Sequence, residues 1–136
     1  MKFCWREYYT RSVRSGCTDK DFTPEVCYNA GVLIGKINLL GYEPAMMFSS
    51  CLRSLEKQKQ VYRDKGITDE SKMPLRSAHL SGEGVDVSDP KQELQRWLKK
   101  HVKKLEELGL YVEDFDSTPT WVHLQTRATK NRFFKP

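Results

Sequence analysis

Two short segments with alternating side chains constrain the fold of this chain more than any other feature. In Val85-Asp86-Val87 two valines flank an acid, and in Trp121-Val122-His123-Leu124-Gln125 two aliphatic residues alternate with aromatic or polar ones. Successive side chains of a strand point to opposite faces of the sheet. Each segment therefore predicts a strand whose aliphatic residues face a core, and neighbouring strands would bring Asp86 and His123 together on the opposite face.

The spacing of apolar residues predicts three helices around these strands. They cover residues 23–41, 54–66 and 89–109, each with a capping residue at its start and a glycine at its end. Short apolar runs at residues 45–51 and 110–113 predict further strands. Helices on one side of a small, mostly antiparallel sheet predict an α+β domain.

The 136 residues contain no internal repeat, low-complexity tract or linker rich in proline, glycine and serine, so they suit one domain. We predict that domain over residues 23–136. Residues 1–22 are polar and lack a clear period, so we expect an irregular N-terminal arm or a short cover over the fold. The last residues, 127–136, are expected to form an end strand or arm that closes the core.

Composition argues against several classes of protein. No stretch approaches the roughly 20 apolar residues that a membrane-spanning helix needs, so we expect no membrane partner. The net charge is +5, but the basic residues are interspersed with acidic ones along the chain. No zinc-finger pattern or basic tail is present, so we expect no nucleic-acid partner. The four cysteines contain no CxxC pair, which favours free thiols over a thiolate zinc site.

Two of the three histidines, His79 and His123, belong to segments that suit one metal site. Two glycines between His79 and Asp86 allow a turn that brings His79 towards the two strand residues. Two imidazoles and one carboxylate are a ligand set typical of a catalytic zinc ion with an open fourth position. The third histidine, His101, lies beside lysines in the third predicted helix and is expected on a solvated face.

Two groups of residues form an ordered pattern along the chain. The first is Ser50-Cys51-Leu52-Arg53-Ser54 with Gln58, and the second is Ser77, His79, Gly82 and Asp86, then Trp121 and His123. The pattern resembles the superfamily of zinc D-Ala-D-Ala carboxypeptidases and L-Ala-D-Glu endopeptidases, whose fold is shared by the hedgehog signalling domain. Its motifs are SGYRS with a following glutamine, then SxHxxGxAxD and WxH. Here Cys51-Leu52 replaces a glycine and an aromatic residue, and Gly84 stands at the usual small position. The resemblance covers residues 23–128 and implies a hedgehog/DD-peptidase-like fold.

The resemblance also implies roles for the matching residues. His79, Asp86 and His123 would bind Zn²⁺. Arg53 would steady the carbonyl oxygen of the scissile bond or a substrate carboxylate, for which a forked guanidinium is suited. The alternative for Arg53 is a surface arginine on a strand–helix turn.

Ser77, Gln58 and Trp121 are candidate substrate-binding residues by the same resemblance. Ser77 either anchors the amino end of the substrate or merely holds its loop. Gln58 is expected to steady the site more than to touch the substrate. Trp121 forms either a wall of the substrate cleft or ordinary packing.

The general base is the point at which the chain departs from the family pattern. Many relatives have Asp or Glu three residues before the last histidine ligand, where this chain has Thr120, which cannot accept a proton at neutral pH. Substitutes upstream are Glu113, Asp114 and Asp116. Glu113 ends a strand expected to pair with residues 121–126, and Asp116 lies in the connecting loop. We take Glu113 and Asp116 as catalytic candidates, with solvated turn acids as the alternative.

The expected function is zinc-dependent hydrolysis of peptide bonds in peptidoglycan stem peptides, by a carboxypeptidase or an endopeptidase that acts as a monomer. The first residues lack the apolar run of a signal peptide. We therefore expect a bacteriophage protein made in the host cytoplasm, which reaches the wall through a holin-type lesion or as a virion component. Thr120 keeps a second hypothesis open, a phage structural or binding module that retains zinc for stability and does not hydrolyse. A cytoplasmic D-Ala-D-Ala dipeptidase is less favoured, because nothing marks a closed dipeptide pocket.

Overall fold

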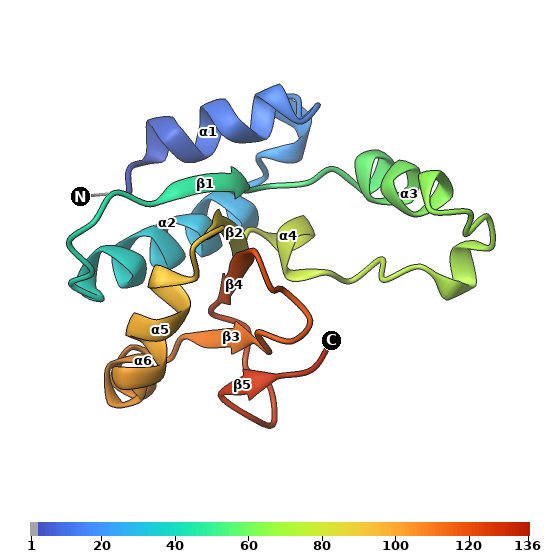
Figure 1. Ribbon diagram of the computed structural model, residues 1–136. Coiled ribbons are helices and arrows are strands. Elements are labelled where there is room, and N and C mark those ends of the chain that lie inside the picture. Colours follow the sequence, from blue (N-terminus) through green and yellow to red (C-terminus); the bar gives the residue numbers. More distant parts are fainter. Residues whose placement is uncertain (1–2) are drawn as a thin grey trace.

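A five-stranded sheet lies at the centre of the computed structural model, which describes residues 3–136 (Figure 1). The strands are β1 (Met47–Ser50), β2 (Gly84–Ser88), β3 (Tyr111–Glu113), β4 (Trp121–Gln125) and β5 (Phe133–Phe134). Their order across the sheet is β1-β2-β4-β3-β5. β5 pairs parallel with β3, and the other neighbouring pairs are antiparallel. The sheet is therefore mixed but mostly antiparallel, as predicted.

Helices around this sheet confirm the α+β class. In the described residues they are α1 (Trp5–Arg14), α2 (Pro24–Leu39), α3 (Leu55–Asp64), α4 (Ala78–Ser81), α5 (Glu93–Lys100) and α6 (Val102–Leu108). Thr23 and Ser54 cap α2 and α3 as predicted, because each hydroxyl accepts the backbone N–H three residues on. Figure 1 shows α3 projecting away from the sheet on extended connections. Among the described residues, no helix has the length and apolar character needed to cross a membrane.

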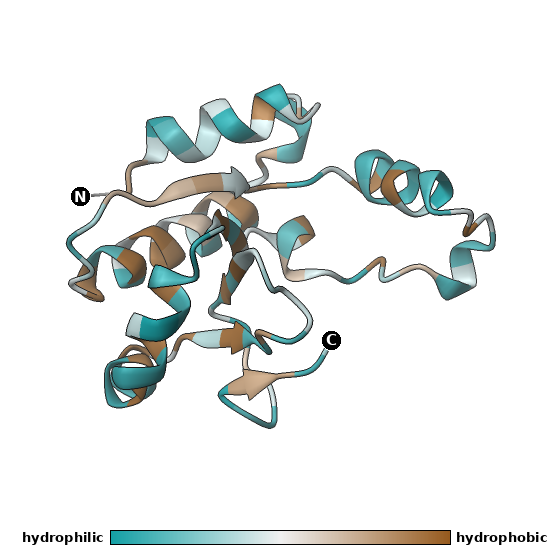
Figure 2. Ribbon diagram, in the orientation of Figure 1, coloured by the Kyte–Doolittle hydropathy of each residue, from teal (hydrophilic) through white to brown (hydrophobic). Residues whose placement is uncertain are grey.

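The aliphatic residues of the two central strands lie in one core. Those fully buried are Val85, Val87, Val122 and Leu124. They share a hydrophobic cluster with the apolar residues of α2, and Figure 2 shows hydrophobic residues along α2 and these strands. The predicted alternation is thus confirmed. With the aliphatic residues inside, Asp86 and His123 belong to the opposite face.

The N-terminal segment contains a helix packed on the sheet, which corrects the expectation of an irregular arm over residues 1–22 and agrees with the alternative of a cover over the fold. Its first two residues lie outside the described part. Helix α1 lies alongside β1. Phe3 is buried, and its ring stacks on Phe48 of β1 at a centroid distance of 3.7 Å. Ser12 Oγ accepts a hydrogen bond from the Leu52 N–H at 3.0 Å. These contacts make the segment part of the core, and the helix starts without the side-chain cap that would reveal it in the sequence.

The third predicted helix is broken in two at His101, which corrects the expectation of one helix over residues 89–109. In a continuous helix the His101 N–H would bond the Trp97 carbonyl. Instead the His101 imidazole Nδ1 lies 2.7 Å from that oxygen, and the N–H bonds the Leu98 carbonyl. The imidazole also stacks on the Trp97 ring at 3.8 Å. The helix also begins at Glu93, four residues after the predicted cap Asp89, although the Asp89 carboxylate still accepts two backbone N–H groups of the first turn of α5.

Candidate metal centre

The three predicted ligands, His79, Asp86 and His123, converge on one point. Asp86 and His123 are direct cross-strand partners in β2 and β4, while His79 comes from α4. Asp86 Oδ1 lies 2.8 Å from His123 Nδ1 and 3.2 Å from His79 Nε2. One ligand atom from each residue lies within 4.8 Å of the others. Both histidines are buried, and the group could hold a metal ion.

Two glycines allow the chain to bring these groups so close. Gly82 ends α4 in the left-handed conformation, with φ +82°, and a Cβ there would lie 2.7 Å from the Val26 carbonyl oxygen of α2. A Cβ on Gly84 would lie 2.8 Å from His123 Cε1 and 2.9 Å from Ala78 Cβ. Both distances are shorter than van der Waals contact. Glycine at these positions therefore lets α4 pack directly against α2 and β4.

In each imidazole, the outer nitrogen, which is the one that points away from Asp86, has its own hydrogen-bond acceptor. His79 Nδ1 lies 2.9 Å from the Cys51 carbonyl oxygen, which can only accept, so His79 Nδ1 carries a proton. His123 Nε2 lies 2.8 Å from Gln125 Oε1, and the amide of Gln125 donates to the Arg127 carbonyl. Both inner nitrogens then face the centre of the group. Such outer partners orient metal-ligating histidines and select the coordinating nitrogen.

Without a positive charge between them, the inner atoms would repel. Two nitrogen lone pairs would face the Asp86 oxygen at 2.8 and 3.2 Å, unless both imidazoles took up an extra proton. A divalent ion satisfies all three donors at once. Imidazole nitrogen and carboxylate oxygen are donors that suit Zn²⁺. The residues present therefore fit the expected cofactor.

The same contacts determine the protonation of the metal-free group. Burial by itself raises the pKa of the Asp86 carboxyl, but hydrogen bonds and positive charge from His123 and His79 hold that pKa well below its usual range. Burial by itself lowers the pKa of His123, but the bond to Asp86 outweighs it and raises that pKa above its ordinary value. A metal ion that binds here would therefore compete with a proton for His123.

Glu113 lies beside this group on the neighbouring strand. β3 and β4 pair antiparallel with Val112 opposite Leu124, so the next step of the ladder places Glu113 opposite His123 on the same face. Burial raises the pKa of the Glu113 carboxyl above its ordinary value, although positive charge at His123 opposes the shift. A carboxyl with a raised pKa is a stronger proton acceptor than a solvated one, which suits a general base.

Arg53, Gln58 and Ser77 lie on the α4 side of the group. The Arg53 guanidinium donates to Gln58 Oε1 at 2.7 Å and to Ser50 Oγ at 3.3 Å, and its backbone N–H donates to the His79 carbonyl. Gln58 is buried and also donates to a loop carbonyl, so it holds the Arg53 side chain in place. Ser77 caps α4 by accepting the His79 N–H at 3.3 Å. Arg53 and Ser77 both line a pocket of about 600 Å³.

Trp121 and Asp116 are less closely tied to the group. Within residues 3–136, neither forms a hydrogen bond or ring contact with the three ligands. Trp121 is half-buried at the start of β4, two residues before His123. Asp116 is exposed in the loop between β3 and β4, where it lines a second pocket of about 730 Å³. Of the two predicted bases, Glu113 is therefore the one beside His123.

Two neighbours of His123 were not among the predicted site residues. Gln125 is buried and follows His123 by two residues, so the strand period alone could have identified it. Phe134 of β5 presents its ring edge-on to His123 at a centroid distance of 6.1 Å. No signal in the sequence links Phe134 to the site, because the pairing of β5 with β3 uses backbone groups that every residue has.

The described residues therefore bring together three candidate metal ligands, an acceptor for each outer imidazole nitrogen and one neighbouring carboxyl. Arg53 adds a positive charge on the α4 side. The chemistry of the site is inferred from these groups alone, because comparisons of the chain with protein-family models, curated proteins and solved structures gave no match.

Proposed function

We propose that this protein is a zinc-dependent peptidase with a hedgehog/DD-peptidase-like fold, which hydrolyses peptide bonds in peptidoglycan stem peptides. The buried group of His79, Asp86 and His123 carries the proposal, because its inner donor atoms converge while both outer imidazole nitrogens have acceptors. The order of the motif residues along the chain supports the choice of family. Glu113 beside His123 favours a hydrolase over a module that holds zinc only for stability.

The residues around the metal ligands suit peptide hydrolysis. Bound zinc supplies a Lewis acid that polarises the scissile carbonyl and lowers the pKa of its water ligand to about 7. Glu113 accepts a proton from the attacking water and delivers it to the leaving amine. Its raised pKa suits both transfers, since the carboxyl can release the proton as well as take it up.

Arg53 supplies positive charge for the substrate. Within the described residues, neutral oxygens of Gln58 and Ser50 hold its guanidinium, and no carboxylate pairs with it. The charge is therefore available to the carbonyl oxygen of the scissile bond or to a substrate carboxylate. Arginine suits this role better than lysine because Gln58 orients its planar fork.

Peptidoglycan suits the charge of the chain and the space beside Arg53. A net charge of +5 favours an anionic polymer as partner. The pocket of about 600 Å³ that Arg53 and Ser77 line is within the range of small-ligand sites and has room for part of a peptide, and the three candidate metal ligands lie outside its lining. We place the activity in a phage wall-degrading protein, which a holin-type lesion or the virion itself would deliver to the wall.

Cleavage of isolated wall material tests this function. Zinc-loaded protein incubated with peptidoglycan of several wall types should release fragments that mass spectrometry identifies, and a chelator should abolish their release. Failure to cleave any wall type while zinc is bound would refute the peptidase and establish the stability-only module instead. The mass of a released fragment would also identify the bond that is cut.

Two isosteric variants test the proton acceptor. Glu113→Gln keeps the shape of the side chain but cannot take the proton, so the rate should fall about 10²- to 10⁴-fold with zinc content unchanged. Asp116→Asn is the matched comparison, because this exposed loop acid has no contact with the ligands. A larger loss of rate in Asp116→Asn would assign the proton transfer to Asp116.

A further inference from the structure

The three ligands are not held in place equally. Asp86 and His123 are fixed relative to each other by the backbone ladder between β2 and β4. The ladder extends to the Glu83 carbonyl, which accepts the Thr126 N–H, and no further. His79 lies beyond it on α4, a helix of four residues. One backbone hydrogen bond reaches His79, from the N–H of Arg53 in the segment after β1 to the His79 carbonyl. The position of His79 relative to β4 therefore depends on side chains.

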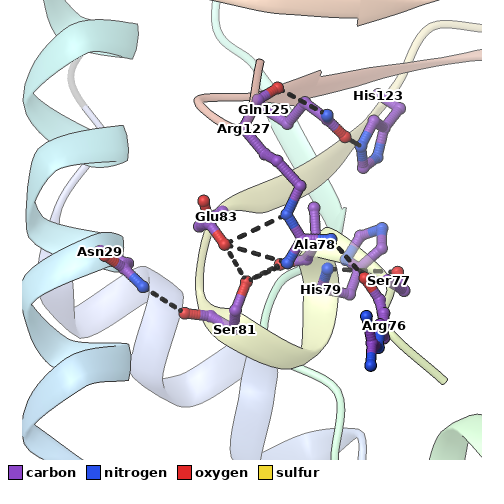
Figure 3. Close-up of polar contacts among 10 residues, drawn as sticks. All are labelled: Asn29, Arg76, Ser77, Ala78, His79, Ser81, Glu83, His123, Gln125 and Arg127. Atoms are coloured by element: carbon purple, nitrogen blue, oxygen red, sulfur yellow. Dashed lines mark hydrogen bonds and ion pairs between the residues drawn. The ribbon is translucent and has the colours of Figure 1, made fainter. Parts of the chain in front are cut away.

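Arg127 follows β4 and reaches across to the α4 segment, as Figure 3 shows. Its Nη1 donates to the carbonyl of Arg76, and its Nη2 donates to Ser81 Oγ at 2.9 Å and to Glu83 Oε1 at 3.0 Å. Its Nε lies 3.3 Å from the same Glu83 oxygen. Arg76 precedes His79 in the chain and Ser81 follows it. One guanidinium thus holds both ends of the segment that carries this ligand.

The same residue is connected to the other histidine. The Arg127 carbonyl accepts the amide of Gln125 at 2.8 Å, and Gln125 Oε1 accepts His123 Nε2 at 2.8 Å. Hydrogen bonds therefore connect His123, through Gln125 and Arg127, to the residues on either side of His79. Figure 3 shows both halves of this connection.

The acceptors that meet the guanidinium are themselves held. Ser81 Oγ lies 2.6 Å from Glu83 Oε1, to which it donates. The Ser81 carbonyl accepts the side-chain amide of Asn29 from α2 at 3.0 Å. A lysine at position 127 could donate to one of these acceptors, but it lacks the planar guanidinium that donates to several acceptors at once.

We propose that Arg127 is a positioning residue of the metal site, whose guanidinium holds the α4 segment over β4 and so sets the distance between His79 and His123. The inference rests on metal binding by the proposed site and not on which bond is cut. An ordinary surface ion pair would contribute only to stability. Arg127 differs because the elements that it joins carry the two histidine ligands.

Arg127→Met tests the proposal by removing the fork while keeping an aliphatic stem. The Zn²⁺ affinity, measured by competition with a chromophoric chelator, should fall about 10- to 100-fold, as for other changes outside the ligands themselves. The d–d absorption of Co²⁺ bound in place of zinc should change as well, because it reports the geometry of the ligands and not the stability of the protein. Arg127→Lys should restore part of the affinity.

Lys59→Met is the matched control. It also removes one positive charge and one ion pair, with Glu70 at 2.9 Å, but this pair joins α3 to the loop after it. It should leave both the zinc affinity and the Co²⁺ spectrum unchanged.

If Arg127→Met does not fold, Glu83→Gln replaces it as the test. This variant keeps the shape of the side chain and removes the negative charge that accepts two hydrogen bonds from the Arg127 guanidinium. Zinc affinity and a Co²⁺ spectrum equal to those of the wild type in the folded variant would overturn the proposal. Wild-type protein that binds neither metal would overturn both the positioning role and the proposed function. Wild-type metal binding without hydrolysis would refute the proposed function alone.

Discussion

Replacing Gly84 by alanine tests how closely the chain must approach the metal ligands. The new Cβ would lie 2.8 Å from His123 Cε1, 3.2 Å from His123 Nε2 and 2.9 Å from Ala78 Cβ. Gly84 does not have the positive φ that disfavours alanine, so the effect of the substitution comes from these contacts. The variant therefore isolates the packing between α4, β2 and β4.

The magnitude follows from the overlap. Carbon atoms in contact lie about 3.5 to 4.0 Å apart, so a Cβ placed 2.8 Å from the His123 ring must displace it by roughly 0.7 Å. Neither the His123 ring nor Ala78 can move away easily, because hydrogen bonds hold both nitrogens of the ring and the Ala78 Cβ is attached directly to the backbone. Overpacking of this kind costs about 1 to 3 kcal/mol. At about 4 °C per kcal/mol, the Tm of the metal-free protein should fall by roughly 4 to 12 °C.

Gly31→Ala on α2 is the matched control, since a Cβ at Gly31 meets nothing within 4 Å. Alanine in place of glycine inside a helix raises the free energy of unfolding by roughly 0.5 to 1 kcal/mol, so this variant should have a slightly higher Tm than the wild type. Calorimetry of the metal-free proteins should thus show opposite shifts, and zinc titration should show weaker binding in Gly84→Ala alone. A Gly84→Ala protein with wild-type Tm and zinc affinity would refute the reasoning from close packing.

Three further predictions concern single groups. Gln125→Leu removes the acceptor of His123 Nε2 and should weaken zinc binding about 10- to 100-fold in chelator competition; an unchanged dissociation constant would contradict this role. Since the neighbouring carboxylate raises the pKa of His123 despite burial, zinc binding near neutral pH should release protons and weaken as the pH falls, which calorimetry in buffers of different ionisation enthalpy measures. Equal affinity at acidic and neutral pH would argue against a proton at this ligand. Burial raises the pKa of the Cys17 thiol to about 11 and of the Cys51 thiol to about 12, so a thiol reagent should label exposed Cys4 rapidly and these two only on unfolding. Comparable labelling rates would mean that Cys17 and Cys51 are not buried in solution.

Much of the fold could be predicted where adjacent residues carry the signal. The alternation in β2 and β4 allows only one facing that buries the aliphatic residues, so their orientation followed from the sequence. The caps of α2 and α3 could also be identified from neighbouring residues. Helix α1 could not be predicted in this way, because its start has no side-chain cap. The adjacent Phe3 is also buried by stacking on Phe48 of β1, which is distant in the sequence. The break at His101 depends on a bond from the imidazole to the backbone, which helical spacing does not reveal.

The convergence of the three candidate metal ligands could be predicted because coordination requires particular residue types in a particular order. Glu113 beside His123 follows from the same strand parity, once β3 is paired with β4. The outer contacts could not be predicted in this way. Arg127 meets Ser81 and Glu83 across 46 and 44 residues of sequence, and arginine is common in many settings, so nothing local marks it.

The position of α4 outside the ladder between β2 and β4 also bears on the speed of metal exchange. Short segments without a backbone ladder open at a lower free energy than paired central strands. His79 should therefore leave the ion first, while Asp86 and His123 still hold it on the intact sheet. Metal release then requires only the opening of a four-residue turn, so a chelator can act on the folded protein. The lifetime of an ion bound at this site would then be governed by the opening of α4, whereas its affinity would depend on all three candidate ligands.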